Sequence, residues 1–163
     1  MIANALSCGQ TQIFNFAMGS SFSPLRKPGE ASAYHQLTHE ERIDPQLGYQ
    51  PTCRWLAEQQ MGFFVELVQM LDSIREGDAT LLDRTLVFAY TDHGEARLHS
   101  MKQYPVFTAG GANGRMRTGH HINAEGDTVT RVGLTIQQAL GISTGSWGTE
   151  TNRATRPFSE LLA

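Results

Sequence analysis

The chain has 163 residues and a formal net charge of −3, with 13 basic and 16 acidic side chains. This length and a hydrophobic content of 40% suffice for one globular domain, whereas the balanced charge gives no basic footprint for nucleic acid. No apolar run reaches the roughly 18 residues that span a bilayer. The two cysteines, Cys8 and Cys53, are too few for a disulfide framework, and we expect both to be structural.

The first residues predict the end of a helix that leads into a strand. Ala3, Ala5 and Leu6 are helix formers and Gly9 stands where a helix would terminate, while Gln12–Met18 alternates as a strand does. A chain that begins in this way indicates the C-terminal part of a longer protein. The Ser-, Gly- and Pro-rich segment Gly19–Ser32 predicts a loop.

A histidine pair follows that loop, at His35 and His39. The spacing of four residues puts both imidazoles on one face if the segment is helical, and a short loop also brings them together. The alternative is a pair of exposed loop histidines, because a bare HxxxH pattern is not specific.

The clearest helix in the sequence begins at Pro51. Proline suits a first helical turn, and an apolar face with helical spacing ends before Gly77; its members are Leu56, Phe63, Leu67, Leu71 and Ile74. With the following strand this helix has the length of a crossover unit in a parallel sheet.

Two apolar runs, Leu86–Tyr90 and Tyr104–Ala109, each lead into a polar segment that contains histidine. An apolar run without alternation is typical of a strand buried on both faces of a parallel sheet, and ligands bind where such strands end. The first loop reads Thr-Asp-His-Gly-Glu, and we expect Gly94 to permit a tight turn that brings Asp92 and His93 together.

The rest of the chain adds two histidines and a helix. The segment GRMRTGHHI contains His120 and His121, and Val129–Leu140 has helical spacing, with Thr128 or Thr130 as its cap and Gly141 after its end. All six histidines thus fall in three segments. A parallel sheet would gather these segments at one edge, where their imidazoles and Asp92 would bind one or two divalent ions, such as zinc.

Several segments of the chain resemble the C-terminal half of a bacterial family designated DUF1552, which is itself similar to the alkaline phosphatase and sulfatase superfamily. The resemblance covers most of Gln12–Ala163 and rests on YHxxTH, TDHGE-x3-HS, PVFTAGG, GRMRTGHH and the closing segments through RPFSELL. It implies a three-layer α/β/α sandwich with a mostly parallel sheet, here an incomplete one. It also implies export to an extracytoplasmic location, although this chain shows no signal peptide.

The resemblance implies a set of ligands. Asp92 and His93 would bind one metal, and His39 with His121 the other, while His35 stands where the phosphatases have an aspartate ligand. The nucleophile and a further aspartate ligand would come from the superfamily's N-terminal half, which lies outside this chain.

Other polar residues near these positions have two interpretations each. His99 is either a hydrogen-bond partner that orients a metal ligand or a surface residue. Glu95, Arg97, Arg115 and Arg117 either contact an anionic ester substrate or simply solvate a face. The function predicted on these grounds is metal-dependent hydrolysis of a phosphate or sulfate ester. The alternatives are a non-catalytic binding or structural protein and an inactive truncated product.

Overall fold

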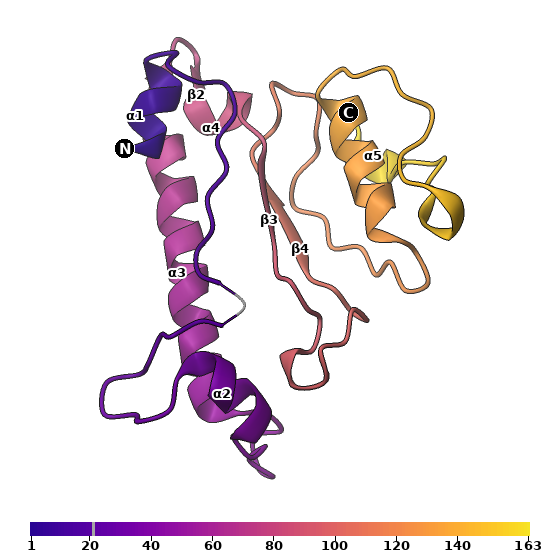
Figure 1. The fold of residues 1–163 in the computed structure, drawn as a ribbon. Coiled ribbons are helices and arrows are strands. Elements are labelled where there is room, and N and C mark those ends of the chain that lie inside the picture. The colour runs from indigo at the N-terminus through magenta and orange to yellow at the C-terminus, as the bar shows by residue number, and fades with distance from the viewer. Residues whose placement is uncertain (21) are drawn as a thin grey trace. The chain divides into compact units, whose positions relative to one another are not determined.

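The computed structural model describes residues 1–20 and 22–163 (Figure 1). These residues form two compact units, one of residues 1–70 and 91–105, the other of residues 71–90 and 106–163. Within the predicted loop Gly19–Ser32, residue 21 lies outside the described residues.

The first unit begins with α1 (Ile2–Ser7), which confirms the predicted N-terminal helix. Gly9 follows the helix in the left-handed region, at a φ of +66°. The predicted strand Gln12–Met18 is wrong, because this segment forms no regular structure and the Ile13 side chain is 85% exposed. The Thr11 hydroxyl donates to the backbone oxygen of Ile13 and accepts from its N–H, so a local turn takes up the groups that a sheet would pair.

Helices α2 (Tyr34–Glu40) and α3 (Pro51–Ser73) are joined by hydrogen bonds from two side chains. The Gln50 amide donates to the backbone oxygens of Leu37, Thr38 and Glu41, and the Glu41 carboxylate accepts from the N–H groups of Thr52 and Cys53. Glu41 therefore caps the first turn of α3 from the end of α2.

A small core lies behind this junction. Leu37, Cys53 and Leu56 are buried there, with Tyr34 and Trp55 packed against them. The prediction that the long helix starts at Pro51 is confirmed, but α3 ends at Ser73, before Gly77. Part of its predicted apolar face is wrong as well, since Phe63 is 58% exposed.

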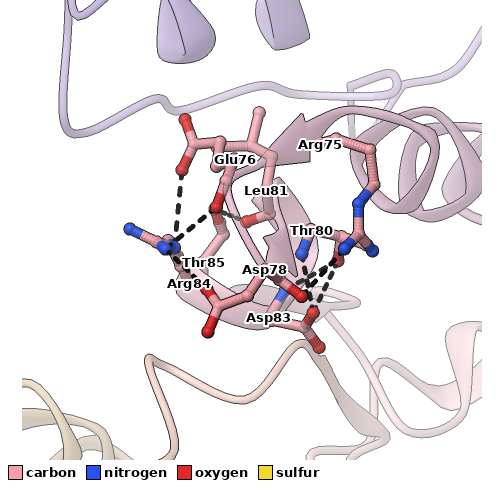
Figure 2. Close-up of polar contacts among 8 residues, drawn as sticks. All are labelled: Arg75, Glu76, Asp78, Thr80, Leu81, Asp83, Arg84 and Thr85. Carbon is pink, nitrogen blue, oxygen red and sulfur yellow. Dashed lines mark hydrogen bonds and ion pairs between the residues drawn. The ribbon is translucent and has the colours of Figure 1, made fainter.

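The second unit begins with a tight hairpin of β1 (Arg75–Glu76) and β2 (Ala79–Thr80), followed by the short helix α4 (Leu81–Arg84). Figure 2 shows the polar contacts that hold these elements together. Thr80 and Asp83 form a reciprocal capping box, in which each side chain accepts from the other residue's N–H. The Arg84 guanidinium donates to the backbone oxygen of Glu76 and lies 3.5 Å from the Asp78 carboxylate.

The strands β3 (Val87–Tyr90) and β4 (Val106–Ala109) pair antiparallel, with Val87 opposite Ala109 and Tyr90 opposite Val106. The predicted three-layer sandwich with a mostly parallel sheet is therefore wrong. The sheets among the described residues are two antiparallel strand pairs. A parallel neighbour needs a crossover that is usually helical, whereas the only helix described between β3 and β4 is the three-residue η1 (Ala96–Leu98).

The burial of β3 also differs from the prediction. Residues along this strand alternate between half-buried and exposed, and Tyr90 is 61% exposed, so the unbroken apolar run does not mark a strand covered on both faces. Hydrophobic composition alone did not distinguish this one-sided hairpin from a central parallel strand.

Helix α5 (Val129–Ala139) supports the C-terminal part of the second unit. It confirms the predicted helix, and Gly141 follows it at a φ of +81°. The hydroxyl of the buried Thr135 accepts from the N–H of Phe158, and the short helices η2 (Glu150–Asn152) and η3 (Ser159–Leu161) shape the rest of the C-terminal segment. One hydrophobic cluster of this unit contains Ala112, Met116 and Ala139, with Leu86, Leu161 and Leu162 packed against it.

None of the helices in the described part of the chain combines the length and the apolar character that crossing a bilayer requires.

Candidate metal centre

Four of the six histidines belong to the first unit, and they lie together. Helix α2 supplies His35 and His39, whose ring centroids are 5.0 Å apart, so the prediction that both lie on one helical face is confirmed. The ring of Phe22 packs on His35 with the centroids 4.9 Å apart. This aromatic contact covers one side of the pair.

The segment of residues 91–105 supplies the other two histidines, His93 and His99. Gly94 allows it to fold back on itself, because a Cβ at this position would overlap the backbone oxygen of Lys102. The N–H of Gly94 donates to the backbone oxygen of Ser100, and Glu95 and Ser100 pair as an isolated antiparallel bridge. The prediction that glycine is needed at position 94 is confirmed through close backbone approach, whereas the chain bends at Gly94 and reverses its direction only at η1 and His99.

This fold presents His99 in an uncommon conformation. His99 ends η1 in the left-handed region, at a φ of +51°. Residues other than glycine rarely adopt this conformation, although histidine is enriched among those that do. Its ring centroid lies 5.0 Å from that of His39 and 4.9 Å from that of His93.

A direct polar contact between two histidine side chains of the cluster joins His39 and His99. Their Nε2 atoms are 3.3 Å apart, and Nδ1 of His39 lies 3.1 Å from the backbone oxygen of Arg97. A carbonyl oxygen only accepts, so Nδ1 of His39 carries the proton of this hydrogen bond and the lone pair of its neutral ring is on Nε2. That lone pair faces His99.

This geometry fits two ligands of one zinc ion. Zn–N bonds of about 2.0–2.1 Å at the tetrahedral angle separate two ligand nitrogens by about 3.3–3.4 Å. Metal-binding histidines also commonly donate their second ring N–H to a backbone carbonyl, as His39 does to Arg97. However, no group of three or more His, Cys, Asp or Glu side chains within the described ranges is arranged to hold a metal. The site is therefore a pair of ligands with further donors nearby.

Asp92 and His93 are the nearest candidates to complete it. Nδ1 of His93 lies 3.4 Å from the Asp92 carboxylate, which leaves Nε2 of His93 free to act as a ligand. The Asp92 side chain is 63% exposed and that of His93 is 27% exposed. Burial first, then Cys53 and Asp92, raise the pKa of Tyr34 above its ordinary value, so the Tyr34 hydroxyl stays neutral and adds no charge to the cluster.

The remaining predicted site residues lie elsewhere or act differently. His120 and His121 are exposed and belong to the second unit, so the role of His121 as a ligand stays a prediction. Arg115 and Arg117 are also exposed in that unit, where their backbone groups pair with Ala163 and Leu161.

In the first unit, Glu95 pairs with Ser100 through its backbone, while Arg97 contributes its carbonyl oxygen to His39. Substrate contact by Glu95, Arg97 and the two exposed arginines of the second unit stays a prediction.

The sequence interpretation gave His99 only an orienting or a surface role, whereas the structure places it in direct contact with His39. The two residues are 60 positions apart, and a spacing of this length has no sequence pattern. The nearness of His99 to His93 along the sequence was the available signal. Comparison of the chain with family models, with curated proteins and with solved structures gave no match.

Proposed function

We propose that this protein binds a divalent transition metal, zinc in the first place, through Nε2 of His39 and Nε2 of His99. The observation that carries the proposal is the 3.3 Å separation of these atoms, with Nδ1 of His39 held by the backbone oxygen of Arg97. Imidazole nitrogen is a ligand that zinc, copper, iron and nickel all accept. Zinc is favoured by the nitrogen spacing, which equals the edge of a tetrahedral site.

The third ligand in this proposal is His93. Its ring lies beside that of His99, and the Asp92 carboxylate on its Nδ1 would fix its orientation. His35 is a further candidate ligand. Its ring centroid lies 5.0 Å from that of His39 and 6.4 Å from that of His99. A fourth position would be left to water or substrate, as in catalytic zinc sites.

The proposed activity of such a site is hydrolysis of a phosphate or sulfate ester. When bound, a divalent ion supplies Lewis-acid activation of an ester oxygen or of water. Support comes from the three histidines beside one carboxylate, from the resemblance of TDHGE to a motif of the phosphatase and sulfatase superfamily, and from the resemblance of YHxxTH to the DUF1552 family. The chain's own residues would bind and orient the ion.

Metal binding is tested by elemental analysis and by titration with Zn²⁺ and Co²⁺, since the visible spectrum of Co²⁺ reports its coordination number. We expect about one ion per chain and a tetrahedral Co²⁺ spectrum. His39→Ala and His99→Asn should each weaken binding about tenfold or more. Asparagine is chosen at position 99 because it tolerates the left-handed conformation.

The matched control is His120→Ala, which removes an exposed histidine from the other unit. It should bind zinc as the unchanged protein does. Equal affinity in His39→Ala, His99→Asn and the unchanged protein would contradict the metal site. Hydrolysis is tested separately with an aryl phosphate and an aryl sulfate: turnover that a chelator abolishes supports the hydrolase, whereas zinc binding without turnover supports the non-catalytic alternative.

A further inference from the structure

The second unit contains a pocket of about 200 Å³ that the proposed metal centre does not use. One wall lies at the start of α5 and is formed by residues 126–128 and Arg131. The other wall is formed by residues 153–156. Pockets for drug-sized ligands measure about 300–1,000 Å³. This one therefore suits a small ion or a small polar group.

The pocket is strongly basic. Arg131, Arg153 and Arg156 all line it, against one acidic residue, Asp127. The carboxylate of Asp127 is paired with Nη1 of Arg131 at 2.7 Å, so these two charges neutralise each other. Arg153 donates to the neutral Ser146 hydroxyl, and the Arg156 guanidinium has no hydrogen bond or ion pair with any residue that the structure describes. Neither the Arg153 nor the Arg156 guanidinium thus has an acidic partner among the described residues.

Arg131 is held rigidly in this wall. Its guanidinium lies 4.0 Å from the centroid of the Phe158 ring and donates to the backbone oxygen of Pro157. Its Nε is fully buried and has no hydrogen-bond partner among the described residues. The side chain as a whole is 23% exposed, so its guanidinium is held in place by these contacts and still borders the pocket.

The backbone at the start of α5 adds donors to the same wall. Thr128 is the N-cap, but its hydroxyl contacts the hydroxyl of Thr130 and makes no cap bond to the helix. The hydroxyl of Thr130 in turn donates to the backbone oxygen of Asn152. The N–H of Arg131 donates to the backbone oxygen of Thr128, whereas the N–H groups of Val129 and Thr130 have no acceptor among the described residues. These two N–H groups lie at the positive end of an eleven-residue helix.

We propose that this pocket binds a tetrahedral oxyanion, namely phosphate or sulfate as the free ion or as the charged group of a small ester. The guanidinium of arginine donates two parallel hydrogen bonds to such oxygens, and here Arg153 and Arg156 would close on an anion that rests against Arg131 and the start of α5. The negative charge of the ligand would neutralise the two unpaired guanidinium groups. This site lies in the second unit and is independent of the proposed metal centre.

The proposal is tested by calorimetric titration with inorganic phosphate and with sulfate at constant ionic strength. Chelator is present throughout, so that no metal contributes. We expect saturable binding of one anion per chain. Arg153→Gln and Arg156→Gln, both at exposed positions, should each weaken binding about tenfold, and the double variant should weaken it further.

The matched control is Arg42→Gln, which removes one positive charge from an exposed position in the other unit. It should bind phosphate as the unchanged protein does. Phenyl phosphate is the second probe: tighter binding than inorganic phosphate assigns the site to an ester, and weaker binding assigns it to the free ion. Absence of saturable binding of both anions, or equal loss in Arg42→Gln and Arg156→Gln, would overturn the proposal whether or not the protein binds zinc.

Discussion

Nε2 of His39 lies 3.3 Å from Nε2 of His99, although the two residues are 60 positions apart in the chain. Without a metal, the N–H of His99 donates to the lone pair of His39, because Nδ1 of His39 already donates to Arg97. With a metal, both lone pairs would point at the ion. The contact therefore suits either state of the proposed site, and zinc would replace one shared proton.

Zinc should stabilise the first unit. A ligand that binds only the folded state adds about 2.7 kcal/mol to the free energy of unfolding when its free concentration is 100 times Kd. We expect thermal unfolding followed by circular dichroism to shift to higher temperature with Zn²⁺ and to return with chelator. The shift should be absent in His99→Asn. A shift of the same size in that variant would mean that zinc binds elsewhere.

Gly94→Ala should weaken zinc binding without removing any ligand. The added Cβ would overlap the backbone oxygen of Lys102, so the turn that carries His93 and His99 must open. We expect a loss in zinc affinity of about tenfold or more, measured by competition with a chromophoric chelator. Gly62→Ala is the control, because nothing lies within 4 Å of a Cβ at that position of α3. Unchanged affinity in Gly94→Ala would show that this turn does not position the ligands.

Glu41 should make stability depend on pH. Partial burial of its carboxylate acts to raise the pKa, but hydrogen bonds from the N–H groups of Cys53 and Thr52 outweigh it and lower the pKa below the ordinary value. The stabilising contribution of Glu41 is therefore present above the ordinary pKa of a glutamate and is lost as the pH falls through the lowered value.

The corresponding variant is Glu41→Gln, which we expect to lower the free energy of unfolding by about 0.5–2 kcal/mol at neutral pH, the range for a lost helix cap. Urea denaturation at neutral pH and below pH about 4 measures the difference, which should shrink in acid. Glu40→Gln, next to it on the exposed side of α2, should show a much smaller effect. A difference that grows in acid would contradict the assigned role of Glu41.

The two cysteines should differ in reactivity. Burial, followed by the nearby Glu41 carboxylate, raises the pKa of the Cys53 thiol to about 12, whereas Cys8 is exposed. Because the thiolate is the reactive form, a disulfide reagent at neutral pH should modify one thiol in the folded protein and two after denaturation. In Cys8→Ser the folded protein should not react. Rapid modification of Cys53 in that variant would show that the core around α2 and α3 opens readily.

Gly110→Ala should destabilise the second unit more than Gly114→Ala does. Both glycines have positive φ, which costs about 1–2 kcal/mol for a residue with a Cβ. At Gly110 the new Cβ would also overlap the backbone oxygens of Thr85 and Leu82, whereas nothing lies within 4 Å of it at Gly114. We expect Gly110→Ala to cost about 1–3 kcal/mol more in urea denaturation. Equal losses in the two variants would mean that β4 shifts to accommodate the methyl group.

The sequence by itself predicted those features that depend on neighbours along the chain. It located the start of α3 at Pro51, the ends of α1 and α5 near Gly9 and Gly141, the shared face of His35 and His39, and the need for glycine at position 94. These features follow from backbone conformations and helical spacing within a few residues, so local preferences are enough to determine them.

Tertiary structure alone decided which distant segments meet. The run Leu86–Tyr90 is compatible with either sheet type, and it forms an antiparallel pair because the segment after it turns back to β4 without a crossover helix. The same holds for the contact of His39 with His99 and for the capping of α3 by Glu41. Each of these three contacts forms only when a loop closes, and the residues at the two ends of that loop share no periodic pattern. The residue types therefore showed which side chains could take part, and only the fold showed which of them pair.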